Sequence, residues 1–192
     1  MDTKIDFKNP EFYENRELSW IKFDNRVLSE ARDKSIPLLE RLKFVSITSS
    51  NLDEFFMVRV ASLQDMVHAN YKKRDIAGMT ATEQLAAINK ATRELVDTQY
   101  NTYTRSLVPL LNKEGIYLVD EHETLTDEQA QFVDRYFMES VYPVLTPMAV
   151  DASRPFPLIR NKTLNIAALL SGKQNSKETV FATVQVPSVL PR

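Results

Sequence analysis

The chain has 192 residues, 43% of them hydrophobic, and its 24 basic and 26 acidic side chains leave a formal net charge of -2. The absence of cysteine excludes disulfides, cysteine catalysis and thiolate metal sites, and the nearly balanced charge gives no general attraction to a polyanion. The isolated glycines Gly78, Gly115 and Gly172 exclude phosphate-binding loops of the Walker or dinucleotide type. Length and apolar content predict a folded protein of one large or two small domains.

The N-terminal residues are polar and aromatic, unlike an apolar targeting segment that follows a basic start. No apolar run approaches the roughly 18 residues of a membrane-spanning helix. We therefore expect a cytoplasmic protein.

Apolar residues at helical spacing predict two helices in the first fifty residues. Ser19 is the predicted N-cap of the first helix, and Pro37 suits the first turn of the second, where its missing amide hydrogen costs nothing. The polar stretch 48–50 is expected to end that second helix.

A third helix is expected to begin at about Asn51. A fourth follows Thr80 and Glu83, which have the spacing of a capping box, and it ends at Gly115. Four helices with short connections predict an N-terminal helical bundle. We place a tail at residues 1–15 and the helical domain at residues 16–116.

The pattern changes after residue 116. Thr126 and Gln129 form a second capping-box pair, which predicts a helix that Pro143 closes. Segments rich in β-branched residues then predict strands at 144–150, 163–170 and 178–186, with a hairpin loop at 171–177. We expect residues 117–192 to form the start of an α/β domain that is truncated within a series of strands.

The two histidines do not form a pair that could hold a metal. His68 lies near a helix end, where a cation complements the helix dipole. His122 lies in the acidic segment 120–123, which could ligate a divalent ion, but solvated loop residues before a helix explain this segment better. We expect no metal site and no catalytic role for either histidine.

Nucleic-acid binding has little support in the sequence. The basic run 72–74 is too short for an electrostatic footprint on a nucleic acid. The aromatic residues recur at helical spacing, which favours a bundle core over a base-stacking platform. This set comprises Trp20, Phe23, Phe55, Phe56 and Tyr103.

The segment 46–60 has the most informative combination of residues. The amide of Asn51 offers a donor and an acceptor, and this pair forms hydrogen bonds with the amine and ring nitrogen of adenine in other contexts. Asp53 and Glu54, in the first turn of a helix starting there, would repel phosphate. The alternative is plain N-capping by Asn51 or Ser50, and spacing alone favours capping.

Two blocks of sequence together resemble the bacterial polyphosphate kinases of family 1, from about Asn15 to the last residue. The first block, ELSWIKFDNRVL (17–28), PLLERLKF (37–44) and SNLDEFFMVRV (50–60), resembles the N-terminal region of that family. The second block, VLTPMAVD (144–151), RPFP (154–157), NKTLN (161–165) and VPSVLPR (186–192), resembles the beginning of its head domain. Departures are modest: Thr48 stands where the family often has an aromatic residue, and Ser62 where glycine is common.

The resemblance implies an enzyme that reversibly transfers the γ-phosphate of ATP to inorganic polyphosphate through a phosphohistidine, with magnesium. It places the catalytic histidines and the magnesium-binding residues in C-terminal domains that this chain does not include. It also implies that Asn51 contacts the nucleotide, which reverses the preference for capping. The expected partners are ATP or ADP, polyphosphate and further copies of the chain through the head domain, with membrane association left open.

The resemblance predicts that these 192 residues are an N-terminal fragment of such a kinase. They would supply the wall of the site on the adenine side and would be inactive alone. The alternative is a non-enzymatic helical interaction module, in which the aromatic residues and Asn51 serve only folding and association.

Overall fold

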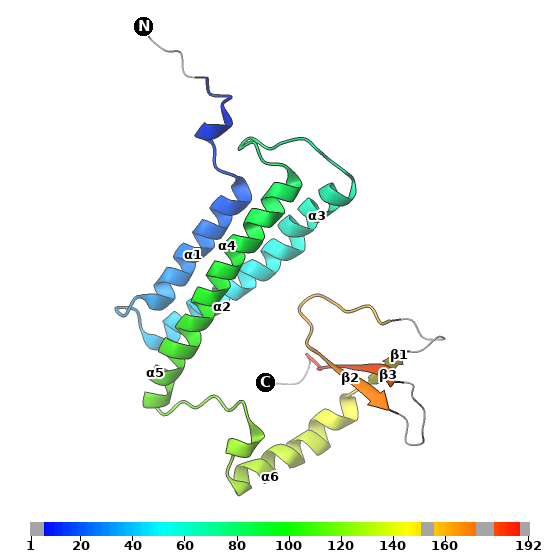
Figure 1. Cartoon of the computed structure of the whole chain (residues 1–192). Coiled ribbons are helices and arrows are strands. Elements are labelled where there is room, and N and C mark those ends of the chain that lie inside the picture. The colour runs from blue at the N-terminus through cyan, green and yellow to red at the C-terminus, as the bar shows by residue number, and fades with distance from the viewer. Residues whose placement is uncertain (1–5, 151–155, 172–178, 189–192) are drawn as a thin grey trace. The chain divides into compact units, whose positions relative to one another are not determined.

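Long helices make up the first of two structural units, residues 1–118, and a helix with a small sheet makes up the second, residues 119–192 (Figure 1). The structure is a computed structural model, and it describes residues 6–150, 156–171 and 179–188. The two units confirm the predicted fold class, a helical bundle followed by the start of an α/β domain.

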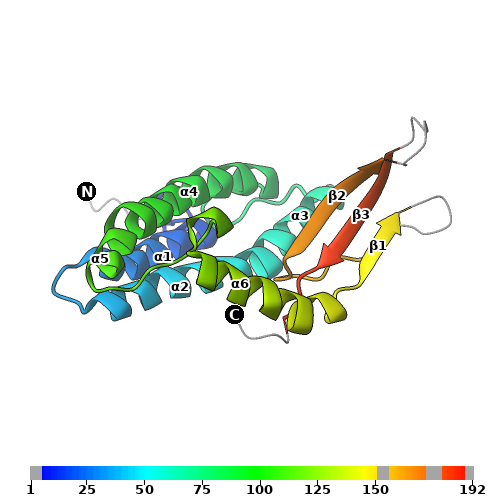
Figure 2. The ribbon, with the colours of Figure 1, turned by 90° about the horizontal axis from the view of Figure 1, so that it is seen from below.

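The helices of the first unit lie alongside one another. They are α1 (Arg16–Arg32), α2 (Leu38–Phe55), α3 (Ala61–His68), α4 (Ala81–Thr102) and α5 (Val108–Lys113), with π-helical turns at Phe56–Val60 and Tyr103–Leu107. Helix α1 packs against both α2 and α4, and α3 packs against α4 (Figure 2). Within the described residues, no helix combines the length and the apolar character needed to cross a bilayer.

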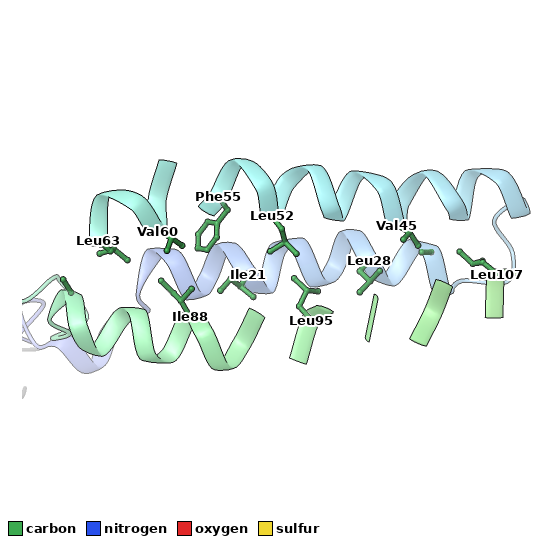
Figure 3. Packing of buried hydrophobic residues seen from close by; sticks show 12 residues of the cluster. Ile21, Leu28, Val45, Leu52, Phe55, Val60, Leu63, Ile88, Leu95 and Leu107 are labelled. Atoms are coloured by element: carbon green, nitrogen blue, oxygen red, sulfur yellow. The ribbon is translucent and has the colours of Figure 1, made fainter. Parts of the chain in front are cut away.

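One apolar cluster holds these helices together. Figure 3 shows its side chains pointing from α1, α2 and α4 into the space between them. Leu28 of α1 and Ile88 and Leu95 of α4 are at most 1% exposed. Burying a side chain of this size contributes about 1.5–3 kcal/mol, so the cluster is a main source of the unit's stability.

No break separates the predicted second and third helices. The helix runs from Leu38 past Asn51 to Phe55 and continues through a π-helical turn into α3. The predicted end at residues 48–50 and the predicted start at Asn51 are therefore wrong. The hydroxyl of Thr48 donates to the carbonyl oxygen one turn earlier at 2.9 Å, so this polar side chain is satisfied inside the helix.

The π-helical turns keep the buried stripe of each long helix facing the core. Buried residues in a regular α-helix recur three or four positions apart. Phe55 and Val60 are five apart, and so are Thr102 and Leu107, yet all four are buried. The wider turn between each pair takes up the extra residue, and the stripe continues on the same side.

A different residue from the predicted one caps α1. The side-chain oxygen of Asn15 accepts hydrogen bonds from the backbone amides of Glu17 and Leu18 at 3.1 and 3.0 Å, so the helix starts at Arg16. Ser19 lies inside the first turn, and the prediction that it caps the helix is wrong. Asn15 is itself buried, and its amide nitrogen donates across the bundle.

The two predicted capping boxes are confirmed. Thr80 and Glu83 cap α4, and Thr126 and Gln129 cap the helix that opens the second unit. The predicted stop after α5 is confirmed as well, because Gly115 has a φ of +77°, which a residue with a side chain adopts only at a cost.

The second unit carries α6 (Asp127–Tyr136) and a three-stranded antiparallel sheet. Strands β1 (Pro147–Val150), β2 (Asn165–Ser171) and β3 (Thr179–Gln185) lie in the order β1-β3-β2, close to the predicted strand segments. Apart from its first residue, the predicted hairpin loop at 171–177 lies outside the described residues. Among the described residues of this unit, only Ala182 and Thr183 are buried.

Candidate nucleotide site

A hollow of about 290 Å³ lies between α1 and the C-terminal part of α2. Its lining is Trp20, Phe23, Asn51, Glu54, Phe55, Val58 and Arg59. Aromatic side chains, one amide and two charged groups therefore meet at one place on the bundle surface. An apolar surface with few polar groups is the usual composition of a small-molecule site.

Two stacked rings form the apolar wall of the hollow. Trp20 of α1 and Phe55 of α2 lie with their ring centroids 4.4 Å apart and their planes 3° from parallel. Phe55 is 2% exposed, so its ring is fixed by the core behind it. Phe23 and Phe56 are 47% and 42% exposed, which corrects the prediction that the whole aromatic set belongs to the core.

The amide of Asn51 is hydrogen-bonded to a buried carboxylate. Its Nδ2 donates a hydrogen bond to Oδ1 of Asp24 at 2.8 Å. Asp24 lies on α1 with no exposed surface, and its Oδ2 is buried without a hydrogen-bond partner among the residues that the structure describes. Burial raises the pKa of Asp24, and the hydrogen bond from Asn51 opposes this by lowering it.

Because Asn51 lies inside α2, it does not cap a helix. Its backbone amide hydrogen is used within the helix, so no free backbone amides are available here for an anion. Asparagine is a poor residue for a helix interior, since its side chain competes for backbone hydrogen bonds. The contacts of its side chain, rather than helix formation, account for an asparagine at this position.

Two charged side chains complete the lining, Glu54 on the last turn of α2 and Arg59 on the π-helical turn that follows. Both are exposed. The π-helical turn places Arg59 at the hollow.

Asp24 was missed by reasoning from sequence, although a signal for it exists. Ile21 and Leu28 are buried on α1, and Asp24 lies three residues after the first and four before the second. A carboxylate on the buried stripe of a helix is rare unless it is paired. Its position therefore marks it as a residue that requires a partner.

Neither histidine contributes to the hollow. His68 ends α3 and is exposed, and Nε2 of His122, in the second unit, lies 3.1 Å from Oδ1 of Asp134. Among the residues that the structure describes, no three His, Asp or Glu side chains gather where they could hold a metal ion. These described residues therefore do not fit a magnesium ion.

Comparison with known proteins points to one family over both units. Residues 13–119 match the family model for the polyphosphate kinase N-terminal domain, and residues 128–192 match the model for the polyphosphate kinase middle domain. A polyphosphate kinase from Lactiplantibacillus plantarum is 53% identical over 188 residues, which cover 98% of this chain and 26% of that protein. One from Bacillus anthracis is 49% identical over 192 residues, covering 98% and 27%.

The fold agrees with a solved structure as well. The crystal structure of polyphosphate kinase from Porphyromonas gingivalis matches with a TM-score of 0.75 and 32% sequence identity. The match covers 91% of this chain and 25% of that one. The chain thus spans about a quarter of the length of the relatives it matches.

Proposed function

The chain belongs to the polyphosphate kinase family, and we propose that it forms the adenine side of the ATP site in an enzyme that reversibly transfers the γ-phosphate of ATP to inorganic polyphosphate. In this proposal the base enters the hollow between α1 and α2, and the phosphates extend away toward parts of the full-length protein outside these residues. No observation on the described residues favours the alternative of a non-enzymatic interaction module.

One observation carries the proposal: the Asn51 amide stands beside an aromatic wall and is held by Asp24. A flat base is bound well by an apolar surface together with a donor and an acceptor at its edge. The amide supplies both groups, in the pairing that suits the amine and ring nitrogen of adenine. Trp20 and Phe55 keep the apolar wall in place because they stack on each other.

The chemistry of transfer is proposed to lie elsewhere in the full-length enzyme. Phosphoryl transfer needs a positioned nucleophile, cationic groups and metal ions that neutralise the phosphates. We assign the phosphohistidine and the magnesium-binding residues to the C-terminal domains, so the 192 residues alone are expected to be inactive. Homo-oligomer formation through the second unit stays a prediction.

The test is Asn51→Ala in a full-length polyphosphate kinase that carries these residues as its N-terminal part. We expect the KM for ATP to rise about five- to tenfold, the loss that follows from one or two missing hydrogen bonds. The KM for polyphosphate should stay unchanged, because the phosphate-binding groups are untouched.

Asn25→Ala is the matched control, since Asn25 lies exposed on α1 and does not line the hollow. Equal changes in both KM values, or no change in the KM for ATP, would contradict a contact between Asn51 and the base. ATP turnover by residues 1–192 alone would contradict the assignment of the chemistry to other domains.

A further inference from the structure

The amide of Asn51 can present two different edges to a ligand. A primary amide has one acceptor oxygen and two hydrogens on nitrogen, and rotation by half a turn exchanges them. With the oxygen toward the ligand, the amide accepts from an exocyclic amine such as that of adenine. With the nitrogen there instead, it donates to a carbonyl such as that of hypoxanthine.

The contact with Asp24 fixes which edge of the Asn51 amide faces the ligand. An ionised carboxylate only accepts hydrogen bonds, so the nitrogen of Asn51 must turn toward it, as the 2.8 Å contact records. One amide hydrogen is then used on Asp24. The oxygen and the other hydrogen of Asn51 are left for the hollow in a fixed order, so a base in one pose pairs with both groups if it presents the amine and ring nitrogen of adenine and with neither if it presents the carbonyl and ring N–H of hypoxanthine.

From this geometry we infer that Asp24 is a positioning residue that turns the acceptor edge of Asn51 toward the ligand and so makes the site select adenine over hypoxanthine. The inference rests on the proposed contact between Asn51 and the base. Asp24 has no exposed surface, so it acts only through Asn51 and does not touch the nucleotide.

The cost of this arrangement supports a role beyond packing. Asp24 is buried in the bundle with its second oxygen unpaired, on a helix stripe where its neighbours Ile21 and Leu28 are apolar. An apolar residue would fill the same position without desolvating a charge. The carboxylate is explained by the fixed direction that it gives to the Asn51 amide.

The test compares ATP with inosine triphosphate, which carries hypoxanthine, in the same full-length enzyme. Asp24→Asn keeps the size of the side chain but allows it to donate as well as accept, so the Asn51 amide can turn either way. We expect the ratio of kcat/KM for ATP to that for inosine triphosphate to fall about fivefold, with the KM for polyphosphate unchanged. Asp53→Asn is the matched control, because Asp53 is exposed two residues from Asn51 and does not line the hollow.

A second measurement uses residues 1–192 and nuclear magnetic resonance of the side-chain amides. The Asn51 amide hydrogens should exchange slowly with water in the wild type and faster in Asp24→Asn, because the fixed acceptor is lost. An unchanged substrate ratio in Asp24→Asn, with Asn51→Ala still raising the KM for ATP, would overturn the role of Asp24 alone. If Asn51→Ala has no effect on that KM, the proposed function itself fails.

Discussion

Replacing Asp24 by asparagine should make the helical bundle more stable at neutral pH. Asp24 has no exposed surface and one unpaired oxygen, and a buried polar atom without a partner costs about 1–3 kcal/mol. Asparagine still accepts from Asn51 and carries no charge, although its own amide nitrogen inherits the unpaired position. The gain therefore comes from removing the buried charge, and we expect it to be about 1–2 kcal/mol of unfolding free energy at neutral pH.

The stability gain of Asp24→Asn over the wild type should increase as the pH rises from acid to neutral. Burial raises the pKa of Asp24 in the folded state above its value in the unfolded chain. Below the unfolded value the carboxyl is neutral in both states and the wild type has its full stability. As the pH rises through the folded value, the buried group ionises and wild-type stability falls. The difference between the variant and the wild type should therefore grow from acid toward neutral pH.

Urea unfolding followed by the fluorescence of Trp20, the only tryptophan, measures this difference within the bundle. The titration should cover pH about 3 to about 8, which includes the usual range of a raised carboxyl pKa. Asp33 and Glu83, whose pKa values are lowered by hydrogen bonds from Ser35 and Thr80, titrate alike in both proteins and cancel. A variant less stable than the wild type at neutral pH, or a difference independent of pH, would refute the reasoning.

Two further substitutions test the packing and the capping of the bundle. Leu95→Ala should lower the unfolding free energy by about 2–5 kcal/mol, because Leu95 is 1% exposed in the core. Leu39→Ala is the control and should cost far less, because Leu39 is 55% exposed. Equal losses in the two variants would contradict the assigned core. Thr80→Ala should cost about 0.5–2 kcal/mol, since its hydroxyl accepts from the backbone amide of Glu83, whereas the exposed Thr82 next to it can be changed to alanine with little loss. Thermal unfolding followed by circular dichroism measures both pairs, and a Thr80→Ala protein as stable as the Thr82→Ala protein would show that the cap contributes nothing.

Local signals in the sequence predicted the parts of the fold that depend on neighbouring residues. The capping boxes at Thr80 and Thr126 use partners three positions away, and the stop at Gly115 depends on the backbone of one residue. The strand segments were predicted from β-branched composition, which is also local.

Features that depend on distant partners were not predicted. Ser49 is part of the polar run expected to end a helix, and Asn51 is the expected start of the next one, yet Gln99 donates to the Ser49 hydroxyl at 2.7 Å and Asn51 donates to Asp24. These partners lie 50 and 27 residues away along the chain. Tertiary contacts therefore satisfy the polar groups that, by their local preference, indicated a loop.

In the candidate site, too, the sequence predicted some features and not those that depend on distant partners. The importance of Asn51 came from resemblance to a family, because its amide chemistry alone could not be distinguished from a helix cap. Its neighbours in the hollow, Trp20 and Phe23, were assigned to the core, since helical spacing shows which residues share a face but not where that face opens. Only the packing of α1 against α2 brings the two sets together.

The π-helical turn after α2 lets the residues that border the hollow change in evolution while the buried core stays the same. A relative lacking one residue of the turn would have Phe55 and Val60 four positions apart, and both would still reach the core along an ordinary α-helix. The deletion would remove one of residues 56–59, which include Val58 and Arg59 of the hollow, while Val60 would keep its place in the core. Insertions and deletions at this point can thus change which residues border the hollow while the bundle keeps its core, so the ligand preference and the stability of the domain can evolve independently.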